Sequence, residues 1–328
     1  MRIDPGVRPA VLAALYLTVS ELGLYEAAAL FGVFPTYVAR FVIMVAACLA
    51  VFAYQRRPAP SLRNFGVAAY LVRSVLFANT TVLLILSFSS SPSLNHTYTV
   101  FMLHIVAAYV IARLPLPLKA PLTRGPLWDG PFALAIVVLL TGIYLYHVVG
   151  LEPGADPQET AEGSRAMIFA GLSAVSFSAS NIMGTVFERE KITGVEGRAL
   201  SSLEVTYLGS VLALIAAPVL ALLLRPAMAT DGLEPGTVVA FVLWALLAAG
   251  LNLPAQTLLL SAFRKTSNPA LVSSMDALVM VFALVPDLLW HGATVSSLLG
   301  TKGLGLALIL VGGAWAIYRD GRHSQPAA

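Results

Sequence analysis

Ten apolar runs follow one another along the chain, separated by short polar breaks. A transmembrane helix needs about 17–25 mostly apolar residues, and the runs have this length. Residues 237–260 and 303–318 contain no charged side chain at all. The pattern predicts ten membrane-spanning helices, at about 9–31, 35–55, 65–88, 93–113, 130–149, 166–187, 203–224, 237–260, 269–290 and 303–318.

The composition agrees with an all-α integral membrane protein. Hydrophobic residues make up 58% of the 328 residues and charged residues 11%, whereas soluble domains have about 45–50% and 25%. The single cysteine, Cys48, lies within an apolar run, so an intrachain disulfide is excluded. Basic residues are spread over short loops without the cluster that nucleic-acid binding requires. We therefore expect a lipid bilayer as the surroundings and no nucleic-acid partner.

Basic residues also predict the orientation, because cytoplasmic loops retain an excess of Lys and Arg. With the N-terminus inside, only Arg165, Arg225 and Lys302 face the opposite side. This bias predicts that both termini lie on the cytoplasmic side. No transit peptide or cleavage site is evident, so we expect the membrane to be a bacterial inner membrane. The cytoplasmic side then holds 15 of the 20 basic residues: Arg2, Arg8, Arg56, Arg57, Arg63, Arg113, Lys119, Arg124, Arg189, Lys191, Arg198, Arg264, Lys265, Arg319 and Arg322.

Five helices in each half imply that the second half is inserted upside down relative to the first. We expect a first five-helix repeat at 1–149, an external linker at 150–165 and a second five-helix repeat at 166–328. The tetrapeptides 91–94 (Ser-Pro-Ser-Leu) and 268–271 (Asn-Pro-Ala-Leu) open the fourth and ninth helices, which are matching positions. The sequence thus predicts two inverted repeats.

Short motifs resemble those of the drug/metabolite transporter superfamily, and within it the EamA-like exporters. Pro35 and Arg40 stand early in helix 2, and small residues in helix 6 lead to Asn181. The last helix contains the glycine-rich stretch 305–313. The chain departs from the family in helix 1, where Leu22 precedes Gly and the family often has Trp. The resemblance implies ten helices in two inverted bundles and outward secondary transport.

Ionisable residues inside spans by default face the protein interior or an aqueous cavity. Glu26 and Arg40 are each about five residues from the outer ends of adjacent helices. Equal depth predicts a Glu26–Arg40 ion pair, which is either structural or part of an outer gate. Glu21 and Arg73 both lie near mid-membrane. They either neutralise each other or hold the two ends of a zwitterion, and Glu21 is a candidate proton carrier.

Further polar residues in spans are candidates for lining a substrate cavity. For each of them the alternative is a purely structural role in helix packing. Asn252 and Gln256 lie at i and i+4, on one face of helix 8. Asp276 lies about seven residues inside helix 9, which by resemblance lines the pathway. The remaining candidates are Asn79, His104 and Asn181.

The sequence favours a secondary transporter, with no cofactor, for a small amphipathic or zwitterionic metabolite such as an amino acid. No Walker A loop is present, so nothing indicates ATP hydrolysis. A flippase for a lipid-like substrate has the same fold and topology and stays open, as does a homodimer. An intramembrane enzyme is a weaker alternative, because no nucleophile motif and no metal-ligand spacing is found. We therefore expect no enzyme activity and no metal site.

Overall fold

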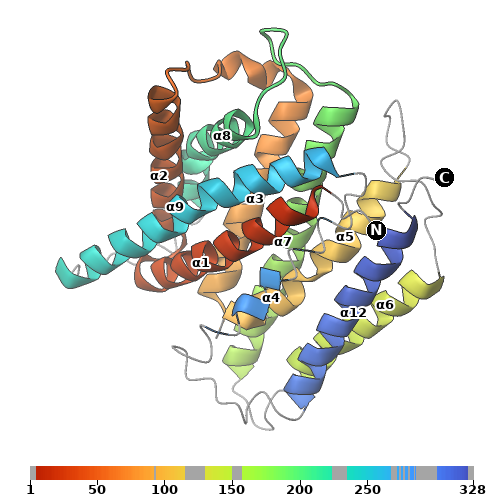
Figure 1. The fold of residues 1–328 in the computed structure, drawn as a ribbon. Coiled ribbons are helices and arrows are strands. Elements are labelled where there is room, and N and C mark those ends of the chain that lie inside the picture. The colour runs from red at the N-terminus through yellow and green to blue at the C-terminus, as the bar shows by residue number, and fades with distance from the viewer. Residues whose placement is uncertain are drawn as a thin grey trace.

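The computed structural model describes residues 5–91, 94–114, 130–149, 157–223, 235–266 and 301–323, together with single positions between 272 and 285. Every regular element of these ranges is helical (Figure 1). The elements are α1 (Val7–Phe31), α2 (Val33–Tyr54), η1 (Leu62–Gly66), α3 (Ala68–Ser89), α4 (Leu94–Phe101), α5 (Leu103–Arg113), α6 (Gly130–Tyr144), η2 (Leu145–Val149), α7 (Pro157–Arg189), α8 (Ser202–Leu223), α9 (Pro235–Lys265) and α12 (Thr301–His323).

The all-α membrane class is confirmed by the length and apolarity of these helices. Among the described residues, six helices are long and apolar enough to cross a membrane: α1, α2, α3, α7, α8 and α9. Large apolar side chains such as Ile168, Val219 and Leu222 are more than half exposed on their outer faces. Such surfaces suit hydrocarbon, which is as apolar as they are. The count of ten spans in two inverted repeats stays a prediction.

Helix boundaries follow the apolar runs, with three differences. The fourth expected span is divided at Met102 into α4 and α5. The fifth continues from α6 into a turn of π-helix, η2. Helix α7 begins at Pro157, so the second part of the expected linker at 150–165 is helical. The expected ninth span, 269–290, is described only at single positions, and Asp276 lies outside the described residues.

Polar residues cap the apolar helix α8 at its N-terminus. Ser201 and Glu204 form a reciprocal capping box, in which Ser201 N donates to Glu204 Oε2 at 2.7 Å and Glu204 N donates to Ser201 Oγ at 3.3 Å. Arg198 donates two hydrogen bonds to the same carboxylate. These bonds hold the pKa of Arg198 above its ordinary value. Glu204 thus fixes the loop between α7 and α8.

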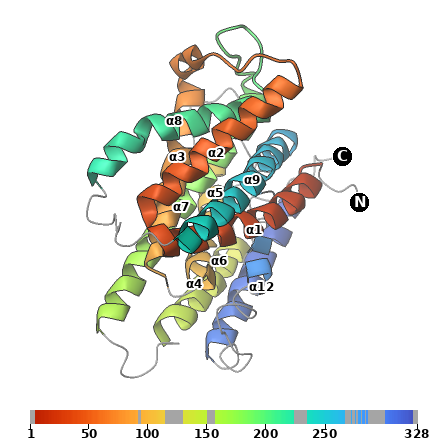
Figure 2. The same cartoon turned by 90° about the vertical axis from the view of Figure 1, so that its left-hand side faces the viewer.

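Helices pack in pairs drawn from distant parts of the sequence. Helix α1 runs along α9, and this pair crosses α3 and α7, which lie along each other (Figures 1 and 2). Helix α2 packs against α8 and α9, and α8 packs against α3. Helices α6 and α12 lie side by side at the periphery of the bundle (Figure 2). The central helices therefore come from both halves of the chain.

Helices α6 and α12 approach each other backbone to backbone at glycines. A Cβ atom added to Gly142 would lie 2.6 Å from the carbonyl oxygen of Gly305. One added to Gly312 would lie 2.8 Å from Leu139 N and 3.0 Å from Ala135 O. Backbone atoms cannot move aside as a side chain can, so these positions require glycine. Small residues at such contacts are how helices associate in lipid, where no hydrophobic effect draws them together.

Two adjacent glycines test this packing. Gly312→Ala is expected to lower the free energy of unfolding by about 1–3 kcal/mol, because the methyl group overpacks the contact with α6. Gly313→Ala is the matched control, since its Cβ would meet only Ile105 and Met102 side-chain atoms at 3.5 Å. It is expected to be neutral or slightly stabilising. Thermal unfolding of the two purified variants in mild detergent measures the difference, and equal melting temperatures would contradict the packing.

Candidate functional site

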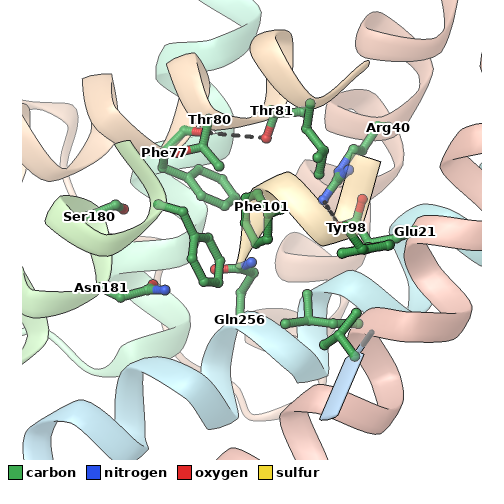
Figure 3. A pocket seen from close by; sticks show the side chains of 14 residues that line it. Glu21, Arg40, Phe77, Thr80, Thr81, Tyr98, Phe101, Ser180, Asn181 and Gln256 are labelled. Atoms are coloured by element: carbon green, nitrogen blue, oxygen red, sulfur yellow. Dashed lines mark hydrogen bonds and ion pairs between the residues drawn. The ribbon is translucent and has the colours of Figure 1, made fainter. Parts of the chain in front are cut away.

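A cavity lies at the centre of the bundle, where helices from both halves of the chain meet (Figure 3). It has about 30 Å³ of open space, which is room for about two water molecules. Most of its wall is apolar or aromatic, and a few polar side chains converge on it. Its lining residues are Leu17 and Glu21 from α1, Arg40 from α2, Phe77, Thr80, Thr81 and Leu84 from α3, Tyr98 and Phe101 from α4, Phe177, Ser180 and Asn181 from α7, Gln256 from α9, and Val279.

An ion pair between Glu21 and Arg40 forms one side of the cavity (Figure 3). Arg40 Nη2 donates to Glu21 Oε1 at 3.4 Å, and the two side chains are 3% and 6% exposed. The pair satisfies only part of either group. Glu21 Oε2 and the Nε and Nη1 atoms of Arg40 have no hydrogen-bond partner among the described residues. Buried polar groups normally have partners, so these atoms are available to a ligand.

The expected Glu26–Arg40 pair is wrong, because the carboxylate that contacts Arg40 belongs to Glu21. The prediction matched the depths of the two residues and ignored their directions. Glu21 and Glu26 are five residues apart, about 140° around the helix. Glu21 is the acid that points into the bundle and is buried, whereas Glu26 is only partly buried. The direction of the side chain therefore decided the pairing.

A tight connection between α1 and α2 positions the two helices that carry Glu21 and Arg40. Gly32 is the single residue between the two helices, with φ of 77° and ψ of −173°. A positive φ is readily adopted only by glycine. Gly32 N also donates to Ala28 O at 2.8 Å, which ends α1. The chain thus changes direction within one residue. Helix α1, which carries Glu21, ends where α2, which carries Arg40, begins.

Other polar groups on the cavity wall also lack partners among the residues that the structure describes. They are the hydroxyl groups of Tyr98 and Ser180 and the amide Nδ2 of Asn181. Gln256 contributes a further amide from α9 (Figure 3). Donors, acceptors and one carboxylate–guanidinium pair therefore converge on a largely apolar space. Pockets that bind small molecules have this character.

Arg73 lies outside this wall, one turn of α3 from Phe77. Its side chain is fully buried, and its guanidinium carbon is 4.6 Å from the centre of the Phe77 ring. Glu21 pairs with Arg40 and not with Arg73. Of the two expected arrangements, mutual neutralisation of Glu21 and Arg73 is therefore excluded by the structure.

Two of the predicted amides make contacts between helices instead of lining the cavity. Asn252 Nδ2 donates to Ser20 Oγ at 3.3 Å, and Ser20 Oγ donates to Ala248 O at 2.7 Å, which joins α9 to α1. Asn79 lies on an exposed face of α3 and donates to Ser176 Oγ of α7 at 2.7 Å. Gln256 and Asn181 are the predicted amides that the structure brings together at the cavity.

His104 repairs the break between α4 and α5. Ile105 N donates to Met102 O at 3.1 Å, one residue short of the α-helical partner, which leaves the carbonyl of Phe101 without that bond. His104 Nδ1 lies 2.8 Å from Phe101 O. A carbonyl only accepts, so Nδ1 carries the proton and donates. His104 is fully buried and satisfies the free carbonyl at the helix break, and it is not among the residues that line the cavity.

Sequence reasoning missed the aromatic part of the site. Phe77, Phe101 and Phe177 line the cavity together with Tyr98. In an apolar span an aromatic residue carries no signal that separates a cavity wall from a core contact or a lipid-facing position. Ser180, which the sequence did not single out as a candidate, also lines the cavity. No group of three or more potential metal ligands occurs in the part of the chain described.

Comparison with known proteins gives a fold and no family. Twenty solved chains resemble this structure. One of them, described only as "Crystal structure of protein", has a TM-score of 0.61 and 16% sequence identity, over 98% of this chain and 99% of that one. At this identity the likeness concerns the fold alone. No protein-family model and no curated protein matches the sequence.

A double-mutant cycle tests the pair that the structure assigns. Glu21→Gln and Arg40→Met should each lower the free energy of unfolding by about 3–5 kcal/mol, because each leaves a buried charge without its partner. Their combination should cost less than the sum, with a coupling of about 1–3 kcal/mol. Unfolding in mixed micelles by titration with SDS measures these values.

The matched control pairs Glu26→Gln with Arg40→Met. Additive effects to within about 0.5 kcal/mol are expected, because Glu26 is on another face of α1. A larger coupling through Glu26 than through Glu21 would restore the pairing expected from the sequence.

Proposed function

We propose that this chain is a secondary transporter that moves a small amphipathic or zwitterionic metabolite, such as an amino acid, by alternating access around the central cavity. The observation that carries the proposal is the half-satisfied Glu21–Arg40 pair on the wall of that cavity. A buried pair with a purely structural role is expected to have its remaining atoms hydrogen-bonded. Here an acceptor and two donors are left over, which suits a ligand that carries both charges.

The packing of the helices supports the two-repeat arrangement that alternating access needs. In the order of the expected spans, α1, α2 and α3 are first to third, and α7, α8 and α9 are sixth to eighth. A two-fold axis between the halves would turn the α1–α9 contact into the α7–α3 contact. It would return the α2–α8 and α6–α12 contacts to themselves. All four contacts are present, as expected for inverted repeats.

Hydrogen bonds between helices follow the same exchange. Ser20 of α1 donates to the carbonyl oxygen of Ala248 in α9 at 2.7 Å. Ser173 of α7 donates to the carbonyl oxygen of Thr80 in α3 at 3.0 Å. Equivalent helices thus use the same residue type in the same way, and each bond joins one half of the chain to the other. This similarity supports two related bundles that meet at the cavity.

The size of the cavity fits a moving site better than a rigid one. A space of about 30 Å³ is far smaller than the roughly 300–1,000 Å³ of ordinary ligand pockets. Entry of a metabolite therefore requires the bundles to separate, as rocking about a central site would do. The likeness of the full-length fold to a solved structure and the motifs shared with the drug/metabolite transporter superfamily are compatible with this class.

Transport in proteoliposomes tests the proposal. The purified chain should accelerate saturable movement of at least one compound from a panel of amino acids, amines and nucleosides. Glu21→Gln and Arg40→Met should each reduce the initial rate at low substrate by about tenfold or more, the cost of one lost charge-assisted hydrogen bond. Arg57→Met, a change at an exposed loop residue, is the matched control.

The same assay separates the alternatives. An imposed pH gradient should drive transport by the unmodified chain and not by Glu21→Gln if Glu21 carries the proton. Unchanged, gradient-driven transport by Glu21→Gln would remove it from that role. If no soluble compound moves but a fluorescent phospholipid crosses the bilayer faster than in empty vesicles, the flippase with the same fold replaces the metabolite transporter.

A further inference from the structure

Arg73 is a buried cation that forms no ion pair with any acid in the described ranges. Its side chain has no exposed surface and is the largest of the fully buried side chains described. None of its three guanidinium nitrogens has a hydrogen-bond partner among the residues that the structure describes. A guanidinium offers five N–H donors and cannot be deprotonated in a protein. An unpaired buried charge of this kind is costly, so its presence calls for an explanation.

Among the residues that the structure describes, the side-chain charge that acts on Arg73 is positive. It is that of Arg264, near the end of α9. Arg264 is itself partly buried, its Nε has no hydrogen-bond partner within the described ranges, and its guanidinium carbon is 5.8 Å from the Phe187 ring centre. The cavity acid, Glu21, is already paired with Arg40. Glu188 and Glu204 act on Arg264, but among the described residues no carboxylate acts on Arg73.

The packing holds the Arg73 guanidinium in place beside the cavity. Phe77, which lines the cavity, also presents its ring to Arg73. On the opposite helix, a Cβ atom at Gly209 would lie 2.9 Å from Arg73 Nη1 and 2.8 Å from Phe77 Cδ1. Glycine thus lets the guanidinium rest against α8, and a larger residue would push the Arg73 and Phe77 side chains aside. The ring face attracts the cation but accepts none of its in-plane hydrogen bonds.

We infer that Arg73 binds an oxyanion, the carboxylate or phosphate of the transported molecule, with Arg264 adding a second positive charge. Guanidinium and oxyanion form paired, charge-assisted hydrogen bonds, which is the partner that the geometry lacks. Phe77 separates this site from the central cavity and must move for the anion to pass between them. The inference rests on the proposed transporter function for its route, and it narrows the substrate to molecules with a negatively charged group.

Anion binding is measured without transport. The purified chain in mild detergent is titrated at constant ionic strength with sodium acetate, sodium glutamate, inorganic phosphate and glycerol 3-phosphate, and its melting temperature is followed. A ligand that binds only the native state raises this temperature as its concentration exceeds Kd. Choline chloride and sodium chloride are the cationic and simple-salt controls. The two carboxylates and the two phosphates distinguish the sources of the oxyanion.

Arg73→Met is expected to weaken the stabilising anion by about 10–100-fold, since it removes two or more charge-assisted hydrogen bonds. Arg264→Met should weaken it less, and Arg63→Met, the same change at an exposed residue before α3, should leave it unchanged. If Arg73→Met does not fold, Gly209→Ala keeps every charge and displaces the guanidinium, so it too should weaken binding.

Two results of the binding experiment would overturn the inference. One is that no anion stabilises the unmodified chain beyond sodium chloride. The other is that the anion binds Arg73→Met, or Gly209→Ala where the former is unfolded, as tightly as the unmodified chain. Anion binding without any transport would leave this site intact and remove the proposed function. Transport confined to neutral or cationic compounds, unaffected by Arg73→Met, would leave the proposed transporter function intact and remove the anion site.

Discussion

Hydrocarbon offers no hydrogen bond to a polar group, and this constraint organises the whole molecule. Hydroxyl groups inside the spans donate hydrogen bonds to carbonyl oxygens of neighbouring helices. Ser20 of α1 donates to a carbonyl of α9, and Ser173 of α7 donates to a carbonyl of α3. The carbonyl freed at the break between α4 and α5 receives His104. Against this background the unpaired atoms are the exceptions. Several of them belong to the Glu21–Arg40 pair and to Arg73, and others lie elsewhere, as on Thr36, His147 and Asn252. The sites proposed for ligands are thus among the places where the described part of the protein leaves its own polar groups unsatisfied.

The class of fold could be predicted from the sequence, because helix length and apolarity are set by the thickness of the bilayer. Apolar runs placed α1, α2 and α9 to within a few residues. The break at Met102 could not be predicted, since 93–113 contains no proline or glycine to mark it. At the break the side chain of His104 replaces one backbone bond through a local bond to Phe101 O, three residues back. The helical start of α7 at Pro157 was missed because 157–165 is polar and reads as a loop.

The candidate site could be predicted in composition but not in arrangement. Glu21, Arg40, Asn181 and Gln256 were expected to matter and all reach the cavity. Their partners were not predictable, because counting residues from the end of a span gives depth and says nothing of rotation about the helix axis. Asn252 shows the same difficulty: one turn from Gln256 on the same helix, it binds Ser20 instead of lining the cavity. Separation of such neighbours needs the crossing of the helices in three dimensions.

The single-residue corner at Gly32 has a mechanical consequence. A longer loop would let α1 and α2 shift independently, with slack taken up between them. With one residue, the relative direction of the two helices is set by a single pair of dihedral angles, φ of 77° and ψ of −173°. Because glycine adopts many combinations of these angles, Gly32 is a pivot about which the two helices can turn while their ends stay together. The carboxylate and the guanidinium carried by these helices are then joined by one short pivot and by their own ion pair.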